Sequence, residues 1–282
     1  MSDAEETERA YLTLASLPDE LEKRESALLL SEVLGVDVYT INQKLKHDPP
    51  LILKQMSVTE ATDMAAALQA AGVSATAISE HDLALVGTPM RVKYLTKIPE
   101  GFIVETWEGI STTLPCEQLR LVIAAPVISE EKRQPAARVR RKHRSIPILP
   151  GAGAGMVAAS IHNIKNAAQA NADLKKAVRN ANIIIDLHTE NDLWFRIDGR
   201  KFGYQVLGEK RALSDYQNSR ILLDMIRECA PEATIDENFH LFRPPPGLKA
   251  ESTDIFAYGQ NHARALADFN FYSRWLSIIK RA

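Results

Sequence analysis

The sequence predicts an α+β protein in which a small βααβαβ domain precedes a larger, β-rich domain. Residues 50–78 have the pattern of a strand, a capped helix and a second strand, and the composition becomes β-rich after Pro89. The length of 282 residues and the hydrophobic content of 45% suit two ordinary cores. The expected parts are a domain at 9–84, a domain formed by 88–128 with 182–230, an insertion at 129–181, and a C-terminal loop and helix at 231–282.

The most regular element of the first domain is a helix expected at 58–71. Ser57 is suited to be its N-cap, and Glu60 completes the reciprocal pair that satisfies amides at a helix start. Apolar residues recur along one face, and Gly72 stands where a left-handed residue commonly ends a helix. An extended apolar start at 51–53 and the alternation over 73–77 predict flanking strands.

Three further elements are expected before this unit. Alternation over 11–17 predicts a first strand, and a proline with two carboxylates at 18–20 favours the first turn of a helix ending at Gly35. Asp37 is the expected cap of a short second helix, which Pro49 terminates. The predicted order is strand, helix, helix, strand, helix, strand.

Residues 33–78 resemble the C-terminal domain of the bacterial ribosomal stalk protein without gaps, and the adaptor of the Clp protease is similar at a greater distance. The matching positions are Gly35, Val38, Leu45, Pro49, Ser57, Ala61, Leu68, Ala71 and Gly72. These positions are core residues or residues that begin or end helices, so the resemblance implies a fold. In the stalk family, basic residues on two adjacent helices recruit translation factors. Here Lys23 matches that set, but Leu28, Ser31 and Tyr39 occupy the other positions, which does not favour factor recruitment.

The second domain is expected to contain about seven short strands. A hairpin signal stands at 108–109 and another turn at 198–199, and Ser214 with Gln217 can cap an amphipathic helix that ends before Pro231. Strands closed by one such helix resemble a pleckstrin-homology-like barrel, and 110–125 is similar to central strands of bacterial members of that superfamily. Two unrelated small β subdomains are the alternative. The expected strands are 91–97, 101–107, 110–114, 119–125, 183–189, 194–197 and 202–207.

A basic run lies within the insertion, almost unopposed by acidic residues, although the whole chain has a net charge of −2. Such a run can contact the phosphates of nucleic acid or anionic lipid, but it has no interleaved aromatic residues to stack on bases. A solvated, flexible insertion is the simpler interpretation. The basic residues are Lys132, Arg133, Arg138, Arg140, Arg141, Lys142 and Arg144.

The glycine-rich stretch after the basic run does not predict a nucleotide site. Gly151, Gly153 and Gly155 fail the dinucleotide pattern because Met156 stands where the third glycine belongs. The glycines are better explained as a hinge before an Ala-rich helix at 157–181. We therefore expect no cofactor.

Asp186, His188 and Glu190 alternate along a predicted strand, so their side chains are expected on one face. An imidazole and two carboxylates can ligate a divalent metal or act as acid and base. The simpler interpretation is the solvent-exposed face of an antiparallel strand, where polar residues are common.

The C-terminal residues predict a helix with a wide apolar face. This face can pack on the protein's own barrel, which we favour, or form a homo-oligomer interface. Its residues are Ala265, Leu266, Phe269, Tyr272, Trp275, Leu276 and Ile279.

The polar, acidic N-terminus does not look like a signal peptide, and no apolar run is long enough for a transmembrane segment. Cys116 and Cys229 are distant in sequence and lack metal-site or redox spacing, which favours buried, inert thiols in a cytoplasmic protein.

Taken together, the patterns favour a non-enzymatic adaptor that binds a protein partner. One alternative is a metal-dependent enzyme that uses Asp186, His188 and Glu190. The other is a ribosome- or nucleic-acid-associated protein that uses the basic run at 132–144.

Overall fold

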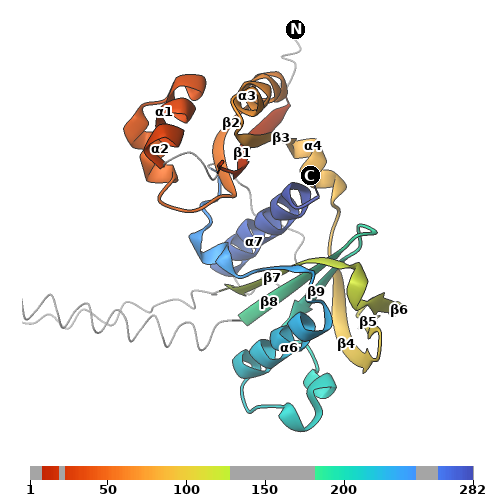
Figure 1. Ribbon diagram of the computed structural model, residues 1–282. Coiled ribbons are helices and arrows are strands. Elements are labelled where there is room, and N and C mark those ends of the chain that lie inside the picture. Colours follow the sequence, from red (N-terminus) through yellow and green to blue (C-terminus); the bar gives the residue numbers. More distant parts are fainter. Residues whose placement is uncertain (1–7, 19–22, 128–181, 246–259, 282) are drawn as a thin grey trace, which may run out of the picture.

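A computed structural model describes residues 8–18, 23–127, 182–245 and 260–281. Within these ranges the fold is mixed α+β, with one sheet of three strands and one of seven. Helices and sheets alternate in layers, and the long helix α7 (Gln260–Ile279) lies between the two sheets (Figure 1). The basic run at 132–144 and the helix expected at 157–181 fall outside the described residues.

The first domain has the predicted element order. Its antiparallel sheet has the order β2-β1-β3, so β1 (Arg9–Ser16) is central and the other two strands are edges. The remaining elements are α1 (Lys23–Leu34), α2 (Val38–Lys44), β2 (Leu51–Ser57), α3 (Val58–Ala70) and β3 (Ser74–Ser79).

Local capping explains where these helices begin. At α3 the Ser57 side chain accepts from the amide of Glu60, and the Glu60 carboxylate accepts from the amide of Ser57, as predicted. A further short helix, α4 (Glu80–Leu85), was not predicted, although Ser79 and Asp82 cap it with the same reciprocal bonds.

The two β-rich halves of the chain share one sheet, with the order β10-β7-β8-β9-β4-β5-β6. Antiparallel pairing of β7 with β8 and parallel pairing of β9 with β4 join the halves, so the alternative of two unrelated subdomains is wrong. The strands are β4 (Met90–Ile98), β5 (Gly101–Thr106), β6 (Ser111–Pro115), β7 (Leu119–Val127), β8 (Asn182–Thr189), β9 (Trp194–Asp198) and β10 (Thr234–Asp236).

One predicted strand is wrong. Residues 202–207 do not join the sheet, because the chain enters the 3₁₀ segment η2 (Tyr204–Lys210). The Tyr204 hydroxyl donates to the carbonyl of Gly199 and lies 2.6 Å from the Ser219 hydroxyl of α6 (Asp215–Cys229). These contacts hold the segment against the helix. The seventh strand of the sheet is instead β10, which pairs in parallel with β7 and was not predicted.

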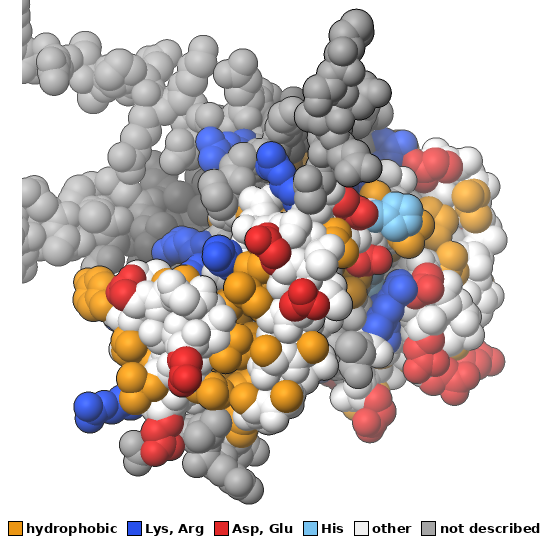
Figure 2. Space-filling view, turned by 90° about the horizontal axis from the view of Figure 1, so that it is seen from above, with side chains coloured by type: hydrophobic (Ala, Val, Ile, Leu, Met, Phe, Trp, Pro, Cys, Tyr) orange, Lys and Arg blue, Asp and Glu red, His pale blue; other side chains and the backbone are white. Residues whose placement is uncertain are grey.

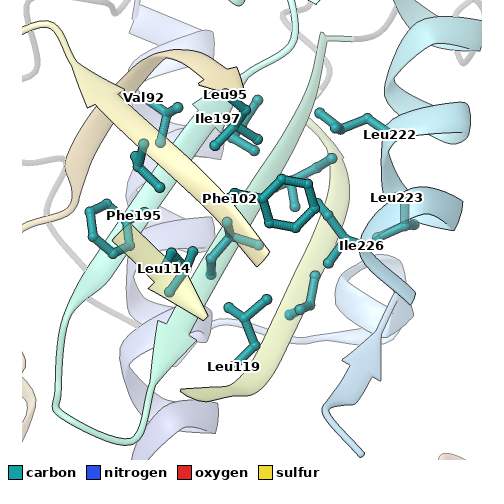
Figure 3. Packing of buried hydrophobic residues seen from close by; sticks show 14 of the residues in the cluster. Val92, Leu95, Phe102, Leu114, Leu119, Phe195, Ile197, Leu222, Leu223 and Ile226 are labelled. Carbon is teal, nitrogen blue, oxygen red and sulfur yellow. The ribbon is translucent and has the colours of Figure 1, made fainter. Parts of the chain in front are cut away.

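Helices cover both faces of the large sheet. On one face, Leu222, Leu223 and Ile226 of α6 point toward the apolar side chains of the strands (Figure 3). We call this cluster the α6-side core. On the other face, α7 packs on β7 and β8, and the three-stranded sheet packs on the opposite side of α7. We call this second cluster the α7-side core.

The position of α7 confirms that it packs on its own chain and removes the surface needed for the homo-oligomer alternative. Trp275 is buried between the sheets, and its indole N–H donates to the Thr13 hydroxyl of β1 at 2.9 Å. The apolar face proposed for an interface is thus occupied by both domains.

Cys116 and Cys229 form a disulfide, so the prediction of two separate thiols is wrong. Their Cα atoms lie 5.5 Å apart across 113 positions of sequence. The bond links the turn η1 (Cys116–Gln118), before β7, to the end of α6. None of the helices in the described ranges combines the length and apolar character needed to cross a membrane.

Candidate functional site

The structure places the three polar residues of the predicted strand in two environments. Asp186 and His188 are 0% and 3% exposed, because β8 is covered by helices on both faces. Glu190 lies beyond the end of the strand and is exposed. The prediction of a solvent-exposed face is therefore wrong for Asp186 and His188, and the structure does not gather the three side chains around one point.

Asp186 is the centre of a buried polar network between the sheet and α7. Arg196, directly opposite on β9, donates to both carboxylate oxygens at 2.7 Å. The hydroxyl of Ser273 on α7 donates to the same carboxylate at 2.6 Å, and Arg196 also donates to the side-chain oxygen of Asn270. This buried ion pair is thus bidentate and has additional hydrogen bonds, as a desolvated pair requires.

His188 extends the network from β8. Its Nε2 lies 2.8 Å from the Ser273 hydroxyl, which already donates to Asp186, so Nε2 carries the proton and donates. Burial lowers the pKa of His188 to about 4, against the opposing effect of Asp186. The imidazole is therefore neutral at physiological pH, and it stacks on Trp194 with 5.3 Å between ring centroids.

The hydrogen bonds of the network connect α7 to the strands β8 and β9. In a catalytic triad the histidine lies between the serine and the carboxylate. Here Ser273 lies between the imidazole of His188 and the carboxylate of Asp186, so the order of a triad is absent from this network. No group of three His, Cys, Asp or Glu side chains within the described ranges could hold a metal ion. The strongest role for these buried residues is to fix α7 on the sheet.

A cavity of about 540 Å³ lies between the two domains, and we call it the interdomain cavity. Residues 40–50 of α2 and its following turn form one wall, and β2 forms a second. Residues 236–245, which include the 3₁₀ turn η3 (Asn238–Leu241), complete the lining with Tyr272 and Trp275 of α7. Its volume lies within the range of ligand sites.

Basic side chains that make no ion pair with the described residues line this cavity, although the charge of Lys54 acts on the carboxylate of Glu60. Lys44, Lys54, His47 and Arg243 are among its lining residues, and none makes an ion pair with the described part of the chain. The Lys44 ammonium is half-buried, which lowers its pKa, and its hydrogen bond to the Ile52 carbonyl is long at 3.4 Å.

The acidic residues of the cavity lining are already engaged. Asp48 pairs with Lys23 at 3.2 Å. Asp236 accepts from the Tyr272 hydroxyl at 2.7 Å and from the amide of Asn238 at 3.0 Å. With Asp48 paired to Lys23, the lining has the cationic side chains of Lys44, Lys54 and Arg243 against the carboxylate of Asp236, which biases the cavity toward an anionic occupant. The face of the molecule in Figure 2 carries acidic and basic side chains interspersed with hydrophobic ones.

A second cavity, of about 570 Å³, lies between α6, η3 and α7. Its lining is largely apolar, and its Arg220 is paired with Glu237. Burial raises the pKa of Asp268 in this lining. This cavity offers no comparable set of uncompensated charges.

Sequence analysis missed the partners in the polar network and the interdomain cavity. A signal for Arg196 existed, because a hairpin centred near Asn191 brings it opposite Asp186. Asn270 and Ser273 were visible as polar positions next to the apolar residues Phe269 and Tyr272 of the predicted helix. The cavity depends on docking between domains, for which the local patterns held no signal. Comparisons with protein-family models, curated proteins and solved structures found no match to the chain.

Proposed function

We propose that the chain is a non-enzymatic adaptor that binds a protein partner at the interdomain cavity. The observation that carries this proposal is a cavity of ligand-site volume lined by basic side chains that make no ion pair with the described part of the chain. The buried network around Asp186 supports a structural role for the residues that would otherwise suggest catalysis. We retain the stalk-like and pleckstrin-homology-like arrangements as parts of this proposal. A cytoplasmic location is also retained, although the disulfide between Cys116 and Cys229 would be unusual in a reducing cytoplasm.

Affinity capture with charge-reversed variants tests the proposal. The full chain, the Lys44→Glu variant and the Lys97→Glu variant are immobilised and exposed to extract from the source cells. Lys97 is an exposed residue of β4 and serves as a matched control away from the cavity lining. We expect a protein that wild type and Lys97→Glu capture and Lys44→Glu loses. Equal capture by all three folded chains would overturn the assignment of the cavity.

A further inference from the structure

We propose that the interdomain cavity takes an extended, acidic peptide segment of a partner, which pairs as an added strand with the outer edge of β2. This inference rests on the proposed function and names the chemistry of the partner. Three features of the cavity carry it: the exposed strand edge, a proline-containing opposite wall and the uncompensated positive charge.

The lining of the cavity shows that the edge of β2 faces it. Five consecutive residues, 51–55, contribute to the lining. Successive side chains of a strand point to opposite faces, so a cavity over one face would be lined by alternate residues only. A consecutive set means that the cavity runs along the backbone edge. Among the described strands only β1 pairs with β2, so its outer edge has no strand partner.

The dimensions of this edge suit a short peptide. The seven residues of β2, at about 3.4 Å each, give an edge of about 24 Å. An extended segment that adds to such an edge gains main-chain hydrogen bonds, while side-chain contacts give specificity.

The opposite wall cannot take the place of this added strand. It includes Pro244 and Pro245, which have no backbone N–H and cannot donate to a ladder. Phe242 precedes them and is fixed against α7, with its ring centroid 5.6 Å from that of Trp275 and 4.9 Å from that of Tyr272. The wall therefore contributes side-chain contacts to the cavity, while Pro244 and Pro245 cannot donate backbone hydrogen bonds to the edge of β2.

The charge of the lining selects an acidic peptide. Lys44 donates to the Ile52 carbonyl of β2, at 3.4 Å, and it has no carboxylate partner. A peptide amide could take over this carbonyl, while the ammonium moves to a carboxylate of the peptide. A hydrogen bond between two charged groups would then replace a 3.4 Å bond from the ammonium to a neutral carbonyl. Arg243 adds positive charge along the same cavity, and so does Lys54, part of whose charge acts on Glu60.

The test is selection from a random phage-displayed library of peptides of about nine residues, long enough to span β2, on the immobilised full chain. We expect selected peptides to carry Asp or Glu at alternate positions. A selected peptide, synthesised and titrated, should lose about tenfold in affinity when its acids become amides or when the chain carries Lys44→Gln. The Lys97→Gln variant should bind as wild type does.

Hydrogen exchange locates the contact. Addition of the selected peptide should slow exchange of backbone amides within β2, and thermal melts should show that each variant is folded. Selected peptides without acidic residues that still protect β2 would overturn the charge requirement and leave the adaptor function standing. Peptides that protect another surface, or no selected peptide at all, would overturn the strand-addition proposal.

Other occupants give different results. Dimerisation of wild type that Lys44→Gln abolishes would identify a second copy as the occupant and overturn the proposal. Equal protection of β2 by N-acetylglutamate would indicate a small carboxylate ligand and overturn it as well. The capture experiment tests the adaptor function separately: if wild type and Lys44→Glu capture the same proteins equally, the cavity is not the binding site of the adaptor.

Discussion

The two faces of the seven-stranded sheet are both buried, but by different chemistry. The α6 side is closed by apolar side chains and a disulfide, whereas the α7 side contains an ion pair, an imidazole and their hydrogen-bond partners. Polar and apolar residues alternate along β8 because its two faces meet two different interfaces. Alternation in a strand can therefore indicate two kinds of buried contact instead of one core and one solvent-exposed face.

The difference suggests how each helix is held in place. Apolar packing on the α6 side depends on shape, and residues of similar volume can replace one another at modest cost. On the α7 side, Ser273 and Asn270 must meet Asp186 and Arg196, so a rotation or shift of the helix would leave buried polar groups unpaired. We expect the network to specify the register of α7 between the two sheets.

Removal of Asp186 should produce the largest effect. The Asp186→Ala variant leaves Arg196 buried without its carboxylate, so we expect a loss of about 3–5 kcal/mol in the free energy of unfolding. Urea denaturation followed by circular dichroism measures it. The Glu190→Gln variant, at the exposed end of the same alternation, should change stability by less than about 0.5 kcal/mol.

A double variant sharpens this experiment. Asp186→Leu with Arg196→Met removes both charges, and it should be more stable than Asp186→Ala. If Asp186→Ala is as stable as wild type, the ion pair does not brace α7. A solvent-exposed face would predict that substitution of Asp186, His188 and Glu190 together costs little, whereas the burial of Asp186 and His188 predicts a large cost.

On the α6 side, the disulfide should account for the next largest effect. Reduction frees the end of α6 from η1, and we expect a loss of about 2–4 kcal/mol from the greater freedom of the unfolded chain. Unfolding with and without reductant measures it, and Cys116→Ala with Cys229→Ala is the control that should not respond. Two free thiols by mass spectrometry in protein from its native compartment would contradict this prediction and agree with a reducing cytoplasm.

Local chemistry made most of the first domain predictable. The reciprocal bonds of Ser57 and Glu60 and the positive φ of Gly72 are set by residues close in sequence, so the bounds of α3 agree with the structure to one residue. The same holds for β5 and β6, on either side of the turn at Gly109, and for β9, which ends just before Gly199, because turns and alternation are local signals.

Long-range contacts determined what could not be predicted. Residues 202–207 alternate like a strand, but Tyr204 bonds to α6 and the segment leaves the sheet. Asp186 and His188 have the spacing of ligands, and only the docking of α7 shows that Ser273 and Arg196 occupy their polar atoms. The interdomain cavity likewise exists only because separate segments meet.

Lowering the pH should weaken the packing of α7 on the sheet gradually, because His188 resists protonation in the folded protein. Its pKa is about 4 in the folded protein and about 6.5 in the unfolded chain. Below pH 6.5 the unfolded chain binds a proton that the folded protein does not bind until about pH 4. The contribution to stability is therefore complete above pH 6.5 and decreases as the pH falls, by about 2 kcal/mol at pH 5.

The control for this prediction is His188→Gln, whose amide can still donate to Ser273. Asp186, Arg120, Arg196 and Arg281 all act on the imidazole and are unchanged in the variant. We expect the difference in unfolding free energy between wild type and variant to change between pH 7.5 and 5. A constant difference would show that His188 titrates normally in the folded protein.

The smallest effect should come from the ion pair between Asp192 and Arg281, at the rim of the α7 side. It joins the same two chemical groups as Asp186 and Arg196, but its side chains are 60% and 39% exposed. Water and salt screen such a pair, and Asn tolerates the positive φ of position 192, so Asp192→Asn should cost less than about 0.5 kcal/mol. Urea denaturation at low and high salt measures this cost, which should disappear at high salt. Both ion pairs join a carboxylate to a guanidinium. If Asp192→Asn lowers the free energy of unfolding as much as Asp186→Ala does, burial does not explain the contribution of the Asp186–Arg196 pair, and this pair is not what holds α7 on the sheet.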